Sequence, residues 1–546
     1  MRDQGAESGA LPADRRGPRL FRVVRSLRRF RPPVRGCQGE PEDRRDPHPL
    51  CGAALRRAAD FALPRRMVPA AHGRLRVPQA EDPVTAPIAV GWRQRPFLLT
   101  FLAALTVRLA YDLILYGSMG PNGLAIEDSR DYLTLGANLL AYGDFVDVTA
   151  QGTLVPHFQF LPVYPLILAV HMALFGADPL FPVLTQAFVG ALTCVLIART
   201  AAVIDPRLAL PAGLFAAVNP TLFILDGLVL TETFFILFCA LSMLSALRWL
   251  EAPNWRWTIL LALSLGLGLF TRTMLLPWVA AVPVLLAIAA LVLRRLTVLA
   301  AIQLLAVVVG AILVVAPMMV RNQETFGTYQ LTAQSGTVFL LWMVPLTMEA
   351  ADGTPHAAGA EQMRKRYEER YGDQGLDPFA QSSAMTAVAM EAFAELGPLP
   401  ILKAWSYGAA INLLAPAVIL SPPVRLLPRT GFYAFEGDSK VEKIIAFLFH
   451  NDNPLYGWVL LLGSVGVVAC RLVQLYGFFT TLRSGRFGAM AALLLLAWIG
   501  FILAVNGPVA SPKYRQPAEI ALTIFFAAGL RAAIDRRSER APVPVG

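Results

Sequence analysis

Several residue types and motifs are scarce in this chain of 546 residues, and each scarcity excludes a class of protein. Only five cysteines are present, with no pair in a predicted external loop, so we expect no disulfide framework. Neither a G-x-G-x-x-G motif after a predicted strand nor a P-loop occurs, which argues against a nucleotide-binding domain. No basic groove with interleaved aromatic residues is present, so nucleic acid is not an expected partner. An internal repeat of the kind that transporters carry is also missing.

Apolar residues, in contrast, are abundant. They make up 55% of the chain, and the mean hydropathy of +0.53 is too high for an ordinary soluble domain. Apolar runs near the length of a membrane span occur at 96–117, 180–203, 208–226, 228–250, 257–272, 275–293, 296–320, 455–478, 487–505 and 517–534. The chain is therefore predicted to be all-α, a polytopic membrane helix bundle with about ten or more transmembrane helices.

The Arg residues set the predicted orientation. They gather in the loops after the second, fourth, sixth and eighth spans and at the C-terminus, which by the positive-inside rule belong to the cytoplasm. We therefore expect an inner-membrane protein with both termini cytoplasmic. The shorter apolar pieces 160–176 and 397–420 would reverse later loops if they crossed, so both are predicted to be interfacial or re-entrant helices. For the second piece the alternative is a crossing paired with another hidden within 421–454.

This topology divides the chain into four predicted regions. The first is an Arg- and Pro-rich cytoplasmic tail expected to be disordered, for which a basic arm on anionic lipid and a true start at Met67 are the alternatives. The third is an external region with interfacial helices and a small helical subdomain. The regions are 1–92, then 93–320 with a first external loop at 118–179, then 321–454, and finally 455–546 with the last spans and a basic tail.

Carboxylates crowd the first external loop in the stretch EDSRDYLTLGANLL. Leucine spacing and Gly143 predict a short helix that begins near Asp128 and Ser129, so Asp128 is either its N-cap or a functional acid. A cap needs one acceptor, whereas Glu127, Asp128 and Asp131 supply three. Carboxylates held near a bilayer are costly and usually functional, which favours the second interpretation.

Charged residues at the outer ends of other spans converge on the same face. Two of them, Arg272 and Arg321, run against the positive-inside bias, so we expect them to bind an external anion such as a lipid phosphate. The last external loop adds Lys513 and Arg515 in the string SPKYRQP. The structural alternative makes the arginines snorkelling anchors. The same alternative makes an i, i+4 ion pair of two residues in the first span, Arg108 and Asp112.

Strings along residues 96–534 resemble, in order, the landmarks of GT-C type membrane glycosyltransferases. After EDSRDYLTLGANLLAYGDF come PHFQFLPVYPLILAVHMALFG, NPTLFILDGLVLTETFF, TRTMLLP, RNQETFG and SPKYRQPAEIAL. The chain is most similar to the branch that holds protein O-mannosyltransferases and the aminoarabinose transferase of lipid A. This resemblance implies a membrane helix bundle whose first seven spans form the shared module, with external helices over a cavity.

The resemblance also implies site residues. It makes Asp128 the catalytic base or a holder of the acceptor, with Glu127 as its neighbour. The family's Pro-Pro-Gly-Tyr-Pro landmark appears here as LPVYP, which retains Tyr164, and His157 upstream is expected to line the same cleft. The Ser/Thr-Glu landmark falls on Thr231 and Glu232.

The family's Arg-Tyr-Arg-x-Pro landmark falls on the last external loop. Lys513 replaces its first Arg, which keeps the charge and loses the bidentate fork, while Arg515 matches the second Arg. With Arg272, Arg321 and Glu232, these residues are expected to bind the donor phosphate.

The implied reaction moves a sugar from a polyprenyl-phosphate donor to a hydroxyl acceptor on the outer face, with inversion at the anomeric carbon. The acceptor is a lipid, a glycan or a protein. No His/Asp/Glu cluster has convincing metal-ligand spacing, but some relatives use a divalent cation, so that cofactor stays an alternative. A flippase or transporter of lipid-linked sugars and a polysaccharide ligase or polymerase are the competing functions.

Overall fold

The computed structural model of the chain describes residues 94–372, 374–428, 440–450 and 453–540. In these ranges helices dominate, and two short strands, β1 (Val146–Val148) and β2 (Leu154–Pro156), pair as an antiparallel hairpin. The predicted all-α fold is therefore confirmed. The predicted tail 1–92 lies outside the described residues.

Ten helical stretches coincide with the ten predicted spans. Among the residues that the structure describes, eight helices are long and apolar enough to cross a membrane singly. Two bent pairs, α6 with α7 and the two helices within 378–414, also qualify, whereas α9 is a shorter apolar helix. The chain is a multi-pass membrane protein. The stretches are α2 (Arg95–Met119), α5 (Leu180–Ile204), α6 (Ala209–Val218) with α7 (Pro220–Asp226), α8 (Glu232–Glu251), α9 (Trp255–Leu269), α10 (Leu276–Val292), α11 (Val298–Phe326), α19 (Pro454–Leu482), α20 (Arg486–Asn506) and α21 (Glu519–Arg540).

The predicted span 208–226 is broken rather than straight. Its two halves meet at an angle of 52°. Pro220 lacks the N–H that a continuous helix would need, and Asn219 caps the second half by accepting a hydrogen bond from the N–H of Thr221 at 3.0 Å. The break ends α6 at Val218, and after α7 ends at Asp226 the chain reaches α8 through the short segment 227–231.

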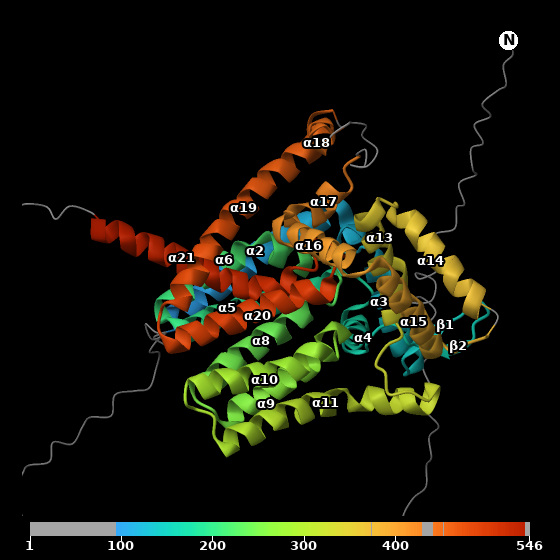
Figure 1. Cartoon of the computed structure of the whole chain (residues 1–546), viewed down its shortest axis with the longest axis horizontal. Helices are drawn as coiled ribbons and strands as arrows, with labels where there is room; N and C mark the ends of the chain where they lie inside the picture. The colour runs from blue at the N-terminus through green and yellow to red at the C-terminus, as the bar shows by residue number, and fades with distance from the viewer. Residues whose placement is uncertain (1–93, 373, 429–439, 451–452, 541–546) are drawn as a thin grey trace, which may run out of the picture. The chain divides into compact units, whose positions relative to one another are not determined.

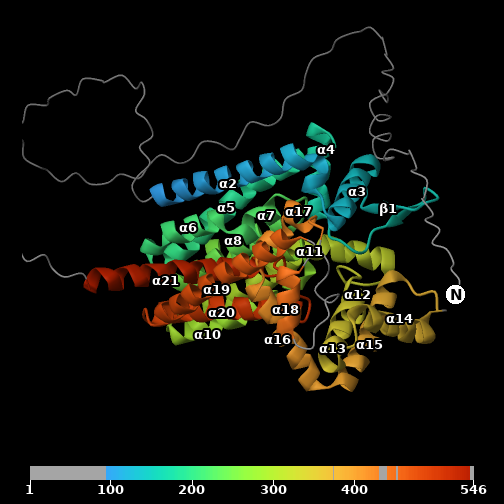
Figure 2. The same ribbon diagram turned by 90° about the horizontal axis from the view of Figure 1, so that it is seen from above.

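The remaining helices gather at one end of the bundle, as Figures 1 and 2 both show for α3, α14, α15 and the hairpin. They are α3 (Glu127–Tyr142), α4 (Val163–Phe175), α12 (Ser335–Val338), α13 (Val344–Asp352), α14 (His356–Tyr371), α15 (Pro378–Leu396), α16 (Pro398–Leu414), α17 (Pro422–Arg425) and α18 (Lys440–Phe449). Helices α13 to α15 pack around a small apolar core that includes Val344, Met363 and Val388.

The two apolar pieces that were expected not to cross are both short helices. The first is α4 and the second is α16, which meets α15 at an angle of 107°. Gly397 makes this corner with a φ of 78°, a left-handed value that disfavours other residues. The hypothesis that α4 and α16 lie at the outer face remains a prediction. Within the described part of 421–454, the helices α17 and α18 are only 4 and 10 residues long.

Two glycines allow α19 and α21 to pack in close contact. A Cβ atom at Gly477 would overlap the carbonyl oxygen of Phe525, and one at Gly529 would overlap the carbonyl oxygen of Val473. Small residues commonly permit such approach of membrane helices. Helix α21 follows the loop that carries Lys513, so this contact holds one wall of the site described below.

We predict that Gly477→Ala destabilises the protein because the added methyl group meets backbone rather than a movable side chain. The expected loss is about 1–3 kcal/mol, seen as a lower melting temperature in detergent. Gly466→Ala on the same helix is the matched control, since its Cβ would meet no atom within 4 Å. Equal melting temperatures of the two variants would contradict the close contact.

Candidate active site

Four of the predicted site residues come together from four distant segments. The Nζ atom of Lys513 lies 2.9 Å from Oδ2 of Asp128 and 3.2 Å from Oε1 of Glu232. The same Glu232 oxygen accepts a hydrogen bond from a terminal nitrogen of Arg272 at 2.7 Å. Two carboxylates and two cations thus form one continuous chain of ion pairs, with a formal charge of zero.

Exposure differs sharply along this chain of ion pairs. The side chain of Asp128 is 50% exposed and that of Lys513 15%, whereas Arg272 is 27% exposed and Glu232 only 2%. Glu232 is therefore the buried end of this series of ion pairs, and Asp128 is its solvent-exposed end. Burial alone would lower the pKa of Lys513, but the nearby carboxylates of Glu232 and Asp128 outweigh this effect and raise it above its ordinary value.

Helix α3 presents Asp128 without using it as a cap. The helix begins at Glu127, and the hydroxyl of Ser129 accepts a hydrogen bond from the N–H of Ile126 at 3.0 Å. The alternative in which Asp128 caps this helix is therefore excluded, and Ser129 provides the cap instead. The carboxylate of Asp128 is left to pair with Lys513. The side chain of Glu127 lies outside the described residues.

A buried polar network supports the segment that leads into Glu232. Gln186 on α5 donates hydrogen bonds to the carbonyls of Asp226 at 2.8 Å and Leu228 at 2.7 Å. Arg108 on α2 pairs with the carboxylate of Asp226 at 2.8 Å. The alternative of an i, i+4 ion pair between Arg108 and Asp112 is not realised, because Arg108 reaches across to Asp226 on α7. Both oxygens of Asp112 lack a hydrogen-bond partner among the described residues.

Two tyrosines line the same region, and one of them was missed from the sequence. Tyr132 lies one helical turn after Asp128, and burial, with the charge of Glu232, raises its pKa to about 12. Its ring packs edge to face against that of Tyr164, with centroids 5.3 Å apart. The hydroxyl of Tyr164 donates to Gln186 at 2.6 Å, so Tyr164 supports the network rather than pointing a free group into the site. The i, i+4 spacing from Asp128 was the signal for Tyr132.

His157 and Arg321 meet each other, away from the four ion-paired residues. The ring of His157 contacts Asp147 at 2.7 Å through Nδ1 and accepts a hydrogen bond from the N–H of Phe160 at 2.7 Å through Nε2. Arg321 donates to the carbonyls of His157 at 2.7 Å and Phe145 at 3.1 Å. These contacts clamp the hairpin onto α11, and they occupy the groups that were expected to face a substrate.

The guanidinium group of Arg515 also contacts other residues of the protein. Its guanidinium lies 2.8 Å from Glu519 and donates to the carbonyls of Asn412 at 2.8 Å and Ala415 at 2.6 Å. Its side chain is 2% exposed. Although only Tyr514 separates it from Lys513, it points into a different cluster and ties the loop to the end of α16. The geometry therefore gives Arg515 a structural part instead of the expected contact with a donor phosphate.

The described part of the chain contains no evident metal-binding site. No group of three or more His, Cys, Asp or Glu side chains there could hold a metal ion. The cations next to Asp128 and Glu232 are those of Lys513 and Arg272.

Part of the chain matches a family of known proteins. Residues 156–320 match the family described as dolichyl-phosphate-mannose-protein mannosyltransferase. This match confirms the resemblance to GT-C type membrane glycosyltransferases. The matched segment contains Tyr164, Glu232 and Arg272 but neither Asp128 nor Lys513. No curated protein matches the chain.

Two solved structures are similar to this chain at low sequence identity. One is the oligosaccharyltransferase AglB from Archaeoglobus fulgidus in complex with an inhibitory peptide and a dolichol-phosphate, at 14% identity and a TM-score of 0.46, with 84% of this chain and 52% of that chain covered. The other is ArnT from Cupriavidus metallidurans bound to undecaprenyl phosphate, at 16% identity and a TM-score of 0.33, with 84% and 82% covered. The chain spans about half the length of the archaeal protein.

We predict that Glu232→Gln destabilises the fold strongly. The change leaves Arg272 and Lys513 facing each other in a largely buried position without the anion that joins them, and loss of one partner in such a setting costs about 3–5 kcal/mol. The melting temperature in detergent measures the effect. Glu361→Gln on α14 is the control, because its carboxylate is 52% exposed and pairs only with Arg364. A Glu232→Gln variant as stable as the control would refute the central role of this carboxylate.

We also predict that acid weakens the hairpin clamp through His157. Burial, helped by Arg321, lowers its pKa below the ordinary value of 6.5 despite the pairing with Asp147 and the nearby charge of Asp131. The unfolded chain therefore takes up the proton first, so the stabilisation is complete above about pH 6.5 and declines as the pH falls below it. The melting temperature should fall more between pH 7.5 and pH 5.5 in the wild type than in His157→Gln. His171→Gln is the control and should retain the wild-type slope.

Proposed function

We propose that this protein is a glycosyltransferase of the inner membrane that transfers a sugar from a polyprenyl-phosphate donor to a hydroxyl acceptor on the outer face. Both termini then lie in the cytoplasm. The observation that carries the proposal is the chain of ion pairs from Asp128 through Lys513 and Glu232 to Arg272. It combines a half-exposed carboxylate with two cations fixed by a buried one. The resemblance to GT-C enzymes supports the same reaction class.

Each residue of the chain of ion pairs has a distinct part in the proposed reaction. The acceptor oxygen attacks the anomeric carbon of the sugar while Asp128 takes the hydroxyl proton as general base. The bond from that carbon to the phosphate oxygen breaks, and its electron pair leaves with the polyprenyl phosphate. Lys513 and Arg272 stabilise the charge that develops on the leaving phosphate. Attack opposite to the leaving group inverts the anomeric configuration.

The two carboxylates and two cations of the site cancel in charge, which suggests how binding of the donor phosphate affects the proposed base, Asp128. Lys513 is shared between Asp128 and Glu232, at 2.9 Å and 3.2 Å. An incoming phosphate competes with Asp128 for this ammonium group, whereas Glu232 is too deeply buried to be displaced. Donor binding would therefore release the carboxylate of Asp128 at the mouth of the site, where the acceptor arrives. Glu232 acts as a positioning residue that holds both cations.

The acceptor is proposed to be chosen by the external region 321–454. Its described helices lie at the same end of the bundle as α3, which carries Asp128 (Figure 2). Lipid, glycan and protein hydroxyls would all need the same base, so the ion pairs themselves do not select among them.

We predict that Asp128→Asn abolishes transfer while the protein still reaches the membrane. The amide keeps the shape of the side chain but accepts no proton, and loss of a general base typically reduces turnover by about 10²–10⁴-fold. Membranes with either form receive a panel of radiolabelled polyprenyl-phosphate sugars, and label in the acceptor fraction is counted. The panel also identifies the donor sugar.

Asp352→Asn is the matched control for this assay. Its carboxylate is exposed at the end of α13 and bonds only within its own turn, to the N–H and hydroxyl of Thr354. It should transfer label at the wild-type rate. Near-normal turnover in Asp128→Asn would remove Asp128 as the base. Movement of intact labelled lipid across the bilayer by every form would replace the transferase with a flippase.

A further inference from the structure

A second charged pocket lies at the opposite end of the bundle from the chain of ion pairs. It is formed by the start of α2, the end of α5, the end of α8 and the start of α9, and its volume is about 300 Å³. Helix α8 links the two sites, since it begins with Glu232 and ends with Glu251, which lines the pocket. Twenty helical residues rise about 30 Å, close to the thickness of the hydrocarbon core of a bilayer. The pocket thus lies at the end predicted to face the cytoplasm.

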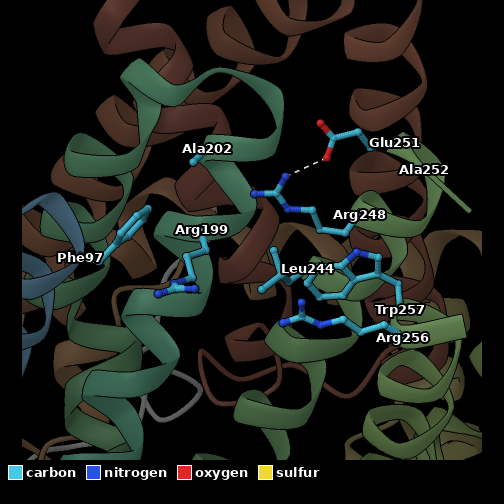
Figure 3. A pocket seen from close by; sticks show the side chains of 9 residues that line it. All are labelled: Phe97, Arg199, Ala202, Leu244, Arg248, Glu251, Ala252, Arg256 and Trp257. Atoms are coloured by element: carbon cyan, nitrogen blue, oxygen red, sulfur yellow. Dashed lines mark hydrogen bonds and ion pairs between the residues drawn. The ribbon is translucent and has the colours of Figure 1, made fainter. Parts of the chain in front are cut away.

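Three arginines from three helices reach into this pocket, as Figure 3 shows. Arg248 pairs with Glu251 at 2.8 Å. Arg199 lies over the ring of Phe97 at 5.0 Å from its centroid. Three guanidinium groups and a single carboxylate give the lining a formal charge of +2.

Arg256 lies over the ring of Trp257 at 5.1 Å, so two of the three guanidinium groups rest on aromatic faces. Neither Arg199 nor Arg256 has a carboxylate within ion-pair distance among the residues that the structure describes. The rings hold the guanidinium planes while leaving their N–H edges free for an anion.

The surroundings of the pocket match the headgroup region of a membrane. Leu98 and Leu99, directly after Phe97, are 43% and 53% exposed, which provides apolar surface for acyl chains. Trp255 is 45% exposed beside the pocket, and Trp residues favour the boundary between lipid and water. We propose that this pocket binds the phosphate group of an anionic phospholipid in the cytoplasmic leaflet, as a site separate from the one for catalysis.

The test uses the full-length protein in nanodiscs made of phosphatidylcholine, into which phosphatidylglycerol is introduced in increasing fractions. Phosphatidylglycerol should raise the melting temperature of the wild type. The double variant Arg199→Gln/Arg256→Gln should need on the order of thirtyfold more of the anionic lipid for the same shift, since each of the two basic residues contributes about 1 kcal/mol near an anionic surface.

The double variant Arg483→Gln/Arg486→Gln is the matched control. It removes two exposed arginines from the loop between α19 and α20, which is predicted to lie on the same side, and it leaves the pocket intact. Ala202→Phe provides an independent variant, because it fills the pocket and keeps every charge. It should lose the response to phosphatidylglycerol, whereas the control pair should retain it.

Two outcomes would overturn the proposal. Equal losses in the pocket pair and the control pair, with no effect of Ala202→Phe, would mean that surface charge alone attracts the lipid. A melting shift with glycerol phosphate in detergent, and none with phosphatidylglycerol in nanodiscs, would assign the pocket to a soluble phosphate compound instead. Neither result bears on sugar transfer, because the pocket shares no residue with the chain of ion pairs.

Discussion

The carboxylate of Glu232 is the constraint on which this end of the helix bundle depends. Its side chain is 2% exposed, and an isolated charge in that position would be strongly unfavourable. Pairing with Arg272 at 2.7 Å and Lys513 at 3.2 Å offsets this penalty only while all three groups stay in place. The turn after α9 and the loop before α21 must therefore both meet the start of α8. The glycine contact between α19 and α21 and the bonds of Arg515 to the end of α16 are what hold that loop in position.

The same constraint separates the roles of the two acids. Glu232 is fixed by its partners and by burial, so it serves to hold positive charge rather than to exchange a proton with a substrate. Asp128 lies at the other side of Lys513 with half of its side chain exposed. The ammonium group of Lys513 therefore joins the buried Glu232 to the half-exposed Asp128. In the proposed reaction the donor phosphate replaces only Asp128. This difference in burial between Glu232 and Asp128 suits the proposed reaction, because the base is released only after the phosphate has bound.

Hydropathy was sufficient to predict the helical stretches at the ten predicted spans, because these depend on local composition. The interfacial or re-entrant placement of α4 and α16 and the external side of the loop before α4 stay predictions. Pairing between distant residues was not predictable in the same way. Arg515 and Lys513 are near neighbours in the chain, yet Arg515 pairs with Glu519 and donates to backbone carbonyls, whereas Lys513 reaches Asp128. Arg321 carries the same charge as Arg272 but clamps the hairpin through the carbonyls of His157 and Phe145. Residue type and position could not separate these cases, since the difference lies in which way each side chain leaves its helix or loop.

The irregular segment before α8 explains why so much polar chemistry is buried beneath the site. A membrane protein tolerates non-helical backbone at depth only where other groups satisfy it. Gln186 provides this for two carbonyls of the segment, Tyr164 fixes Gln186, and Arg108 fixes the side chain of Asp226. A continuous helix through this region would need none of these residues. The irregular segment 227–231 and the polar network that it requires are therefore what bring this carboxylate to its two cations.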